Sequence, residues 1–219
     1  MKIALLELWR RPGRFAVIGS ALVLLVLLML FLGKLLDGLF LGSTGAIRVH
    51  EADRFVFSAD ARESVLRSEI TEADLASMAD LDGVASADAF GMSLLGVAVP
   101  REDDPLDGAI GGYRSAGGGL PVPPASGEAY ADERFGDLGL SLGETVLVGP
   151  AAVPLTVVGW VDDSNYLLQN GLWVDGPTWR EVQNANRPDA RVADDAWQVG
   201  LVRFEPGADP VAVTRALEE

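Results

Sequence analysis

The chain has 219 residues, no cysteine, and 32 Asp and Glu against 17 Lys and Arg. The absence of cysteine excludes disulfide bonds, thiol catalysis and cysteine-ligated metal. The acid excess is uneven: residues 1–14 hold four basic side chains and one acidic (net +3), whereas the remainder holds 13 basic and 31 acidic (net −18). An acidic surface of this kind repels nucleic acid and anionic lipid headgroups, so we expect no nucleic-acid partner.

The first 14 residues mix apolar and basic side chains, among them Leu6, Trp9 and Arg10. We expect a cytoplasmic amphipathic segment over residues 1–14, a short helix on the inner leaflet with the aromatic ring at headgroup depth. Pro12-Gly13 supplies the bend into the next segment.

An uncharged run of 18 residues, Phe15–Leu32, follows. At about 1.5 Å per residue, a helix of this length crosses most of a hydrocarbon core roughly 30 Å thick. Leucines continue at helical spacing, so we expect a transmembrane helix with an extracytoplasmic extension over residues 15–41, ended by the glycines of Gly42–Gly45. The basic N-terminus indicates that residues after about 41 lie outside the cytoplasm. A signal peptide cleaved within residues 41–46 is the alternative.

Short strands and helices alternate after residue 46. The first expected elements are a strand at Arg54–Ser58, a helix at Thr71–Met78 and strand structure at Val84–Val99. Thr71 is the expected N-cap of the helix, and Asp74 completes a capping box. The strand structure is read as one strand or as two that are broken around Gly91.

Residues 100–127 are rich in Gly, Pro and Asp and show no sustained apolar period. We expect a flexible loop over 100–127. Its glycines do not precede a Gly-Lys-Ser/Thr sequence, so they do not form a phosphate-binding loop.

After Glu128 we again expect regular secondary structure, which begins with a short helix or turn at Tyr130–Phe135. Glu144–Val148 and Leu155–Val161 form an expected hairpin around Gly149-Pro150. The later expected elements are a strand at Leu172–Val174, a helix at Pro177–Asn184, a strand at Trp197–Phe204 and a helix at Val211–Leu217 that begins at Asp209-Pro210. The tryptophans of the strands are expected in the core: Trp160, Trp173 and Trp197. Mixed strands and short helices predict an α+β fold, with residues 46–219 as one extracytoplasmic domain.

The residues nominate no catalytic, cofactor-binding or metal-binding site. His50 is the only histidine, so a Ser–His–Asp triad requires it, and its polar neighbours predict a solvated side chain. Asp103-Asp104, Asp162-Asp163 and Asp194-Asp195 fit no EF-hand pattern and are expected in solvated turns. Paired carboxylates for glycoside hydrolysis stay open, but no pair stands out. We expect no cofactor and no enzymatic activity.

Two motifs occur in fixed order in the C-terminal half: Leu142–Val146 (LGETV) and Leu155–Gly159 (LTVVG). In this order they resemble paired strands in the extracytoplasmic domains of MacB/FtsX-type ABC transporter permeases. Further segments are similar to the same proteins: Leu5–Arg14, Asp82–Val84 and Pro206–Pro210, with Ala59–Ile70 similar to the DevC-like branch.

The resemblance implies the N-terminal part of a permease subunit, with one transmembrane helix, a MacB-like periplasmic core domain and a later FtsX-like membrane region. Such subunits pair as homodimers or heterodimers in the bacterial cell membrane, among membrane lipid. A cytoplasmic ABC ATPase subunit binds them and hydrolyses ATP, which drives export of a lipid, lipoprotein or drug-like substrate; this chain has no Walker motif.

The sequence ends at Glu219 without a second apolar span, which predicts a piece of a longer permease or a split or truncated product. The alternative function is a single-pass membrane-anchored extracytoplasmic binding or adaptor module without an ATPase. A membrane-tethered hydrolase is a third reading, against which the single histidine counts.

Overall fold

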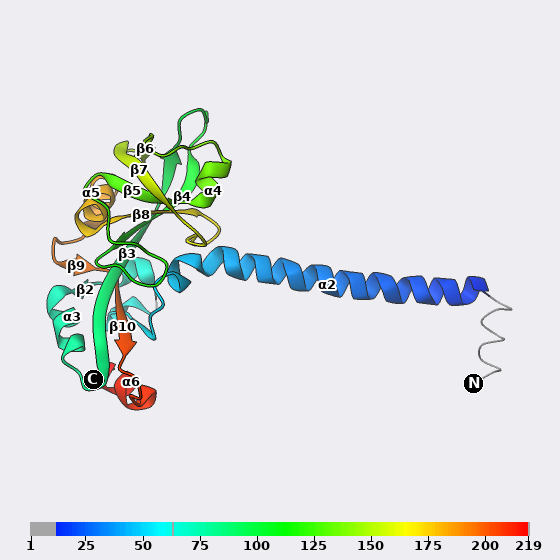
Figure 1. Cartoon of the computed structure of the whole chain (residues 1–219), viewed down its shortest axis with the longest axis horizontal. Coiled ribbons are helices and arrows are strands. Elements are labelled where there is room, and N and C mark those ends of the chain that lie inside the picture. Colours follow the sequence, from blue (N-terminus) through cyan, green and yellow to red (C-terminus); the bar gives the residue numbers. More distant parts are fainter. Residues whose placement is uncertain (1–11, 63, 219) are drawn as a thin grey trace. The chain divides into compact units, whose positions relative to one another are not determined.

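The computed structural model describes residues 12–62 and 64–218 (Figure 1). The chain divides into two compact units, one reaching to Leu41 and one beginning at Gly42. An amphipathic segment is predicted over residues 1–14, and its residues 1–11 lie outside the described part of the chain.

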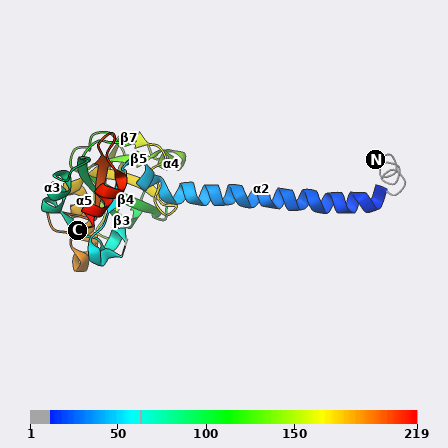
Figure 2. The same ribbon diagram turned by 90° about the horizontal axis from the view of Figure 1, so that it is seen from below.

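The first unit consists of most of helix α2, which runs from Pro12 to Arg48 and appears as one unbroken helix in Figures 1 and 2. Every residue from 16 to 41 is exposed, including the large apolar side chains. The stretch Ala16–Arg48 is long and apolar enough to cross a membrane, with a mean hydropathy of 2.8 over its most apolar part. A helix that is apolar on all sides needs an apolar environment, which a bilayer provides.

The second unit is built on an eight-stranded mixed sheet in the order β1-β10-β3-β4-β8-β5-β7-β6. Its strands are β1 (Arg54–Val56), β3 (Val84–Ala98), β4 (Leu106–Tyr113), β5 (Glu128–Asp132), β6 (Thr145–Val148), β7 (Val153–Val161), β8 (Asn170–Asp175) and β10 (Val199–Phe204). The long strand β3 pairs antiparallel with β10 and β4, and its end also pairs with β6. The pairs β4–β8 and β5–β7 are parallel. A separate small sheet joins β2 (Ile70–Thr71) to β9 (Ala196–Trp197).

Short helices complete the second unit. They are α3 (Glu72–Ala79), α4 (Glu133–Asp137), α5 (Gly176–Asn186) and α6 (Pro210–Leu217), with single turns of 3₁₀ helix at η1 (Ala59–Ala61), η2 (Val65–Arg67) and η3 (Pro188–Ala190). The predicted α+β fold is confirmed. The capping box is present as well, because Thr71 Oγ1 accepts from the Asp74 N–H at 3.2 Å while Asp74 Oδ2 accepts from the Thr71 N–H at 2.8 Å.

The buried side chains of the sheet form two apolar clusters, because successive residues of a strand belong to different clusters. Leu172 and Ile110, which pair across β8 and β4, belong to one cluster, whereas Trp173 and Ala109 belong to the other. Because successive strand residues point to opposite faces, the two clusters cover opposite faces of the sheet. The prediction of core tryptophans is confirmed for Trp173 and Trp197, which are 0% and 3% exposed. Trp160 is partly buried against the first cluster, and Trp179 is also fully buried.

Two predictions about strands are wrong. Residues 106–113, placed in a flexible loop, form β4 in the middle of the sheet, because two of its glycines, Gly111 and Gly112, lie under tryptophan rings rather than in turns. Residues 128–132, read in part as a helix or turn, form β5, and α4 begins only at Glu133. Two other predictions are confirmed. The strand structure at Val84–Val99 is one strand, β3, which continues through Gly91. The predicted hairpin is present as β6 and β7.

The prediction that the glycines of residues 42–45 end the first helix is also wrong, since α2 continues to Arg48. The last turn of α2 packs against the loop that follows β7, and the Ala46 N–H donates to the Asn165 carbonyl at 2.8 Å. A Cβ on Gly45 would lie closer than 3.0 Å to Asn165 Oδ1 and to the Asp163 carbonyl oxygen. Arg48 also forms an ion pair with the Asp163 carboxylate. Gly45 therefore permits close packing and does not stop the helix.

Candidate functional site: two grooves beside helix α5

Helix α5 begins at a local signal in the sequence. The Asp175 carboxylate caps it by accepting from the Thr178 N–H at 3.1 Å, with Pro177 in the first turn. One face of the helix is then fixed to β3, because the Trp179 Nε1–H donates to Ser93 Oγ at 3.1 Å. Buried polar groups satisfied in this way hold a helix in one position on a sheet.

A second tryptophan extends this face. Trp197 of β9 stacks on Trp179, with ring centroids 6.0 Å apart and planes at 5°. The Arg180 guanidinium lies 4.5 Å from the Trp197 ring centroid, and its Nε–H donates to the Ala196 carbonyl at 3.0 Å. Burial lowers the pKa of Arg180, while the nearby Glu72 carboxylate acts in the opposite direction. The guanidinium is thus held on an aromatic face, where the cation–π attraction stabilises it.

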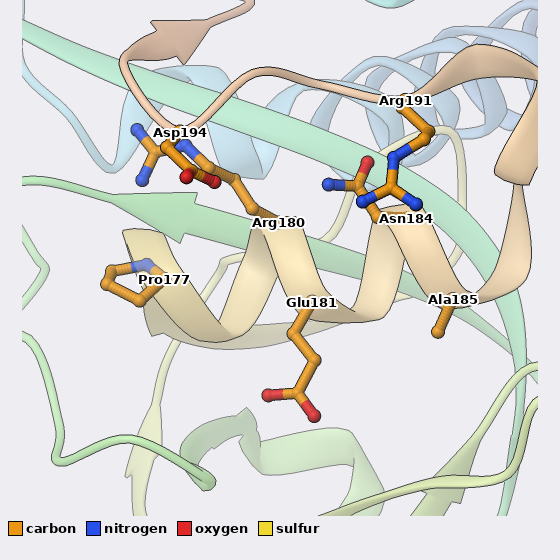
Figure 3. Close-up of a pocket in the computed structure, with 7 residues that line it drawn as sticks. All are labelled: Pro177, Arg180, Glu181, Asn184, Ala185, Arg191 and Asp194. Carbon is orange, nitrogen blue, oxygen red and sulfur yellow. The ribbon is translucent and has the colours of Figure 1, made fainter.

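The larger groove beside α5 has a volume of about 500 Å³. Figure 3 shows its lining residues: Pro177, Arg180, Glu181, Asn184, Ala185, Arg191 and Asp194. The Glu181 carboxylate points away from the other charged side chains in this view (Figure 3). Two arginines and two carboxylates line this groove, so its charged side chains sum to about zero.

The smaller groove, of about 250 Å³, lies at the other end of α5 and reaches η2 and β9. We call it the arginine groove after Arg67, Arg187 and Arg191, which line it together with Gln198. Glu69 is its one acidic lining residue, so its charged side chains sum to about +2. This positive hollow contrasts with the acidic composition of the domain that contains it.

His50 lies elsewhere, and the prediction that it is solvated is wrong. It is 4% exposed, with its ring centroid 4.6 Å from that of Phe90 and 5.4 Å from that of Trp173. Burial, assisted by the positive charge of Arg203, lowers the pKa of His50 to about 3. Its Nε2 makes no hydrogen bond with any described residue. A histidine without a hydroxyl or carboxylate partner at Nε2 is not arranged as the base of a triad.

The three predicted acidic pairs are exposed and stay apart from both grooves, except for Asp194 in the larger one. Within residues 12–62 and 64–218, no cluster of three or more His, Asp or Glu side chains is arranged to hold a metal ion. Sequence reasoning missed the arginine groove, whose charged side chains are mostly basic. Arg67 lies more than 100 residues before Arg187 and Gln198, and the three share no motif, so only the fold brings them together.

No protein-family model matches the sequence, and no curated protein matches it. Solved structures are more informative. The periplasmic region of MacB from Actinobacillus actinomycetemcomitans aligns with 74% of this chain and 79% of its own length, at a TM-score of 0.52 and 13% identity. The extracellular domain of the noncanonic ABC-type transporter YknZ from Gram-positive bacteria aligns with 75% of this chain and 91% of its own, at a TM-score of 0.49 and 13% identity. The MacB alignment establishes the fold: an apolar N-terminal helix followed by a sheet-rich α+β domain similar to the periplasmic region of MacB.

Proposed function

We propose that this chain is the N-terminal part of a permease subunit of an ABC transporter of the MacB/FtsX type. The observation that carries the proposal is the combination of a MacB-like fold with an exposed apolar helix directly before it. The two sequence motifs support it further, because the first leads into β6 and the second lies in β7, where Thr145 pairs with Thr156 and Val146 with Leu155.

In this proposal the basic N-terminus is cytoplasmic, α2 crosses the bacterial cell membrane and the α+β domain lies outside. A separate cytoplasmic ABC ATPase subunit hydrolyses ATP, and permease subunits pair as a homodimer or heterodimer. Movement of the extracytoplasmic domains then drives export of a lipid, lipoprotein or drug-like substrate. No catalytic role falls to the residues of this chain.

The decisive experiment is affinity purification of the tagged, full-length gene product from native membranes in mild detergent, followed by mass spectrometry. We expect an ABC ATPase in stoichiometric amount. An unrelated single-span membrane protein with the same tag is the control. Recovery without an ATPase, in detergent and after cross-linking in intact membranes, would contradict the proposal. It would favour an anchored binding module, for which the arginine groove offers a ligand site.

The orientation can be tested separately, because the chain contains no cysteine. Ala116 is exposed in the α+β domain, and Ala4 lies in the basic N-terminal segment. A membrane-impermeant maleimide applied to intact cells, or to spheroplasts if an outer membrane is present, is expected to label Ala116→Cys but not Ala4→Cys. The reverse pattern would overturn the orientation, and a mature chain that begins near residue 46 would identify α2 as a cleaved signal peptide.

A further inference from the structure

We propose that the arginine groove is a binding site for an oxyanion, the phosphate or carboxylate group of a small ligand. The inference does not depend on the transporter assignment, since it concerns side chains of the α+β domain alone. It rests on three features of the groove: positive charge, an amide with free donors, and one wall held by hydrogen bonds.

The first feature is the charge. None of Arg67, Arg187 and Arg191 forms an ion pair with a described residue. Other arginines of the domain do have carboxylate partners, as in the pairs Arg48–Asp163, Arg101–Glu144 and Arg114–Glu72. Other arginines, such as Arg54 and Arg215, also form no ion pair with a described residue, so what distinguishes the groove is that three such arginines line one hollow with a single acidic residue, Glu69. Guanidinium groups bind carboxylate and phosphate through two parallel N–H···O bonds, so an oxyanion fits them best.

The second feature is the amide of Gln198, which is 5% exposed and lines the groove. Its Oε1 accepts from the Met92 N–H at 2.5 Å, which fixes the orientation of the amide. The Nε2 group has two N–H donors, and neither has an acceptor among the described residues. This nitrogen is not among the buried atoms that lack a partner, so it is open to the groove and free to donate to an oxyanion there.

The third feature is that the wall formed by α5 is held in place by hydrogen bonds, whereas Arg67 and Arg191 are exposed. The Arg187 Nη2–H donates to the Leu94 carbonyl at 3.0 Å, which ties this guanidinium to β3. Gln183 is engaged at both ends, because its Oε1 accepts from Ser93 Oγ at 2.6 Å and its Nε2–H donates to the Ala190 carbonyl at 3.2 Å. Side chains fixed before binding lose little freedom when a ligand arrives. The volume of about 250 Å³ suits a small anionic group better than a polymer.

The test is isothermal titration of the full chain in nanodiscs of zwitterionic lipid at low ionic strength. Inorganic phosphate and citrate are the two probes, and they distinguish a phosphate site from a carboxylate site. Arg67→Gln, Arg191→Gln and the double variant remove charge from side chains that form no hydrogen bond or ion pair with the described residues. Arg215→Gln removes the same charge from the exposed face of α6 and is the matched control.

We expect saturable binding of at least one probe, weakened by about tenfold or more in the double variant and within about twofold of the parent in Arg215→Gln. Each single variant should show an intermediate loss, which covers the case in which the double variant does not fold. Absence of saturable binding by both probes overturns the proposal. An equal loss in Arg215→Gln also overturns it, because net charge and not the groove would then determine affinity. Neither result affects the test of the transporter assignment by ATPase recovery.

Discussion

The indole ring of Trp179 fills the space that a side chain on Gly91 would occupy. A Cβ on Gly91 would lie closer than 3.0 Å to the ring atoms Cη2, Cζ2 and Cε2. Gly112 pairs with Gly91 across β3 and β4, and a Cβ there would meet the same tryptophan equally closely. Two glycines on adjacent strands therefore form the flat surface on which α5 rests, and they set the position of both grooves beside it.

We predict that Gly91→Ala lowers the free energy of unfolding by about 1–3 kcal/mol, because the added methyl overpacks a rigid aromatic contact. Denaturant unfolding followed by tryptophan fluorescence measures the change. Gly136→Ala is the control, since the nearest atom to its added Cβ, on Trp160, is 3.6 Å away. If both variants lose the same stability, the close fit of Trp179 on Gly91 is not the cause.

The capping box of α3 gives a second prediction. Thr71→Ala removes the acceptor of the Asp74 N–H and is expected to cost about 1 kcal/mol of stability. The backbone and side-chain hydrogen bonds from Thr71 to the Asp74 carboxylate lower its pKa, so part of this cost reflects the loss of a charge-assisted hydrogen bond. Thr71→Ser keeps the hydroxyl and should retain nearly all the stability, measured by the same unfolding experiment. A Thr71→Ser loss equal to that of Thr71→Ala would show that the methyl group, rather than the cap, matters.

Signals that act within a few residues were predictable from the sequence. The Thr71 cap, the turn at Gly149-Pro150 and the proline in the first turn of α5 each depend on neighbours in the chain, and each is present. β4 was missed for the opposite reason. Its glycines indicate a loop when read locally, but Gly111 lies under Trp173 and Gly112 under Trp179, both distant in sequence.

The burial of His50 and the arginine groove were hidden for the same reason. His50 has polar neighbours in the chain, while the rings that bury it come from β3 and β8. The groove joins η2 to the C-terminal end of α5, two elements with no shared motif. A single sequence does not show which distant side chains are in contact. A groove formed by such contacts can therefore be identified only in the folded structure.

The last turns of α2 give a third prediction. Gly45→Ala should destabilise the α+β domain by about 1–3 kcal/mol, because its Cβ would collide with the Asn165 side chain and the Asp163 carbonyl. Gly38→Ala lies on the same helix with no atom within 4 Å of its Cβ, so higher helix propensity should leave stability unchanged or slightly raised. Hydrogen exchange of the full chain in nanodiscs separates the two. Equal protection of the loop after β7 in both variants would show that Gly45 does not set this packing.

Acid sensitivity is the fourth prediction, and it follows from His50. The pKa of His50 is about 3 in the folded chain against 6.5 for an unperturbed histidine. The unfolded chain therefore binds a proton that the folded chain does not, so stability from this group is fully present above pH 6.5 and is lost as the pH falls from 6.5 towards 3. The loss is about 2 kcal/mol by pH 5.

His50→Phe isolates this contribution. Phenylalanine keeps an aromatic ring between Phe90 and Trp173 but takes up no proton, and the ring of His50 has no hydrogen bond at Nε2 to lose. Carboxylates titrate alike in both chains, so the difference between the two unfolding free energies, measured from pH 7.5 to pH 5, reports His50 alone. As the pH falls from 7.5 to 5, we expect the unfolding free energy of His50→Phe to rise by about 2 kcal/mol relative to that of the parent chain, whatever the difference at pH 7.5. Curves that stay parallel would mean that the folded chain protonates His50 near its ordinary pKa, and that the aromatic cluster around it admits a charge.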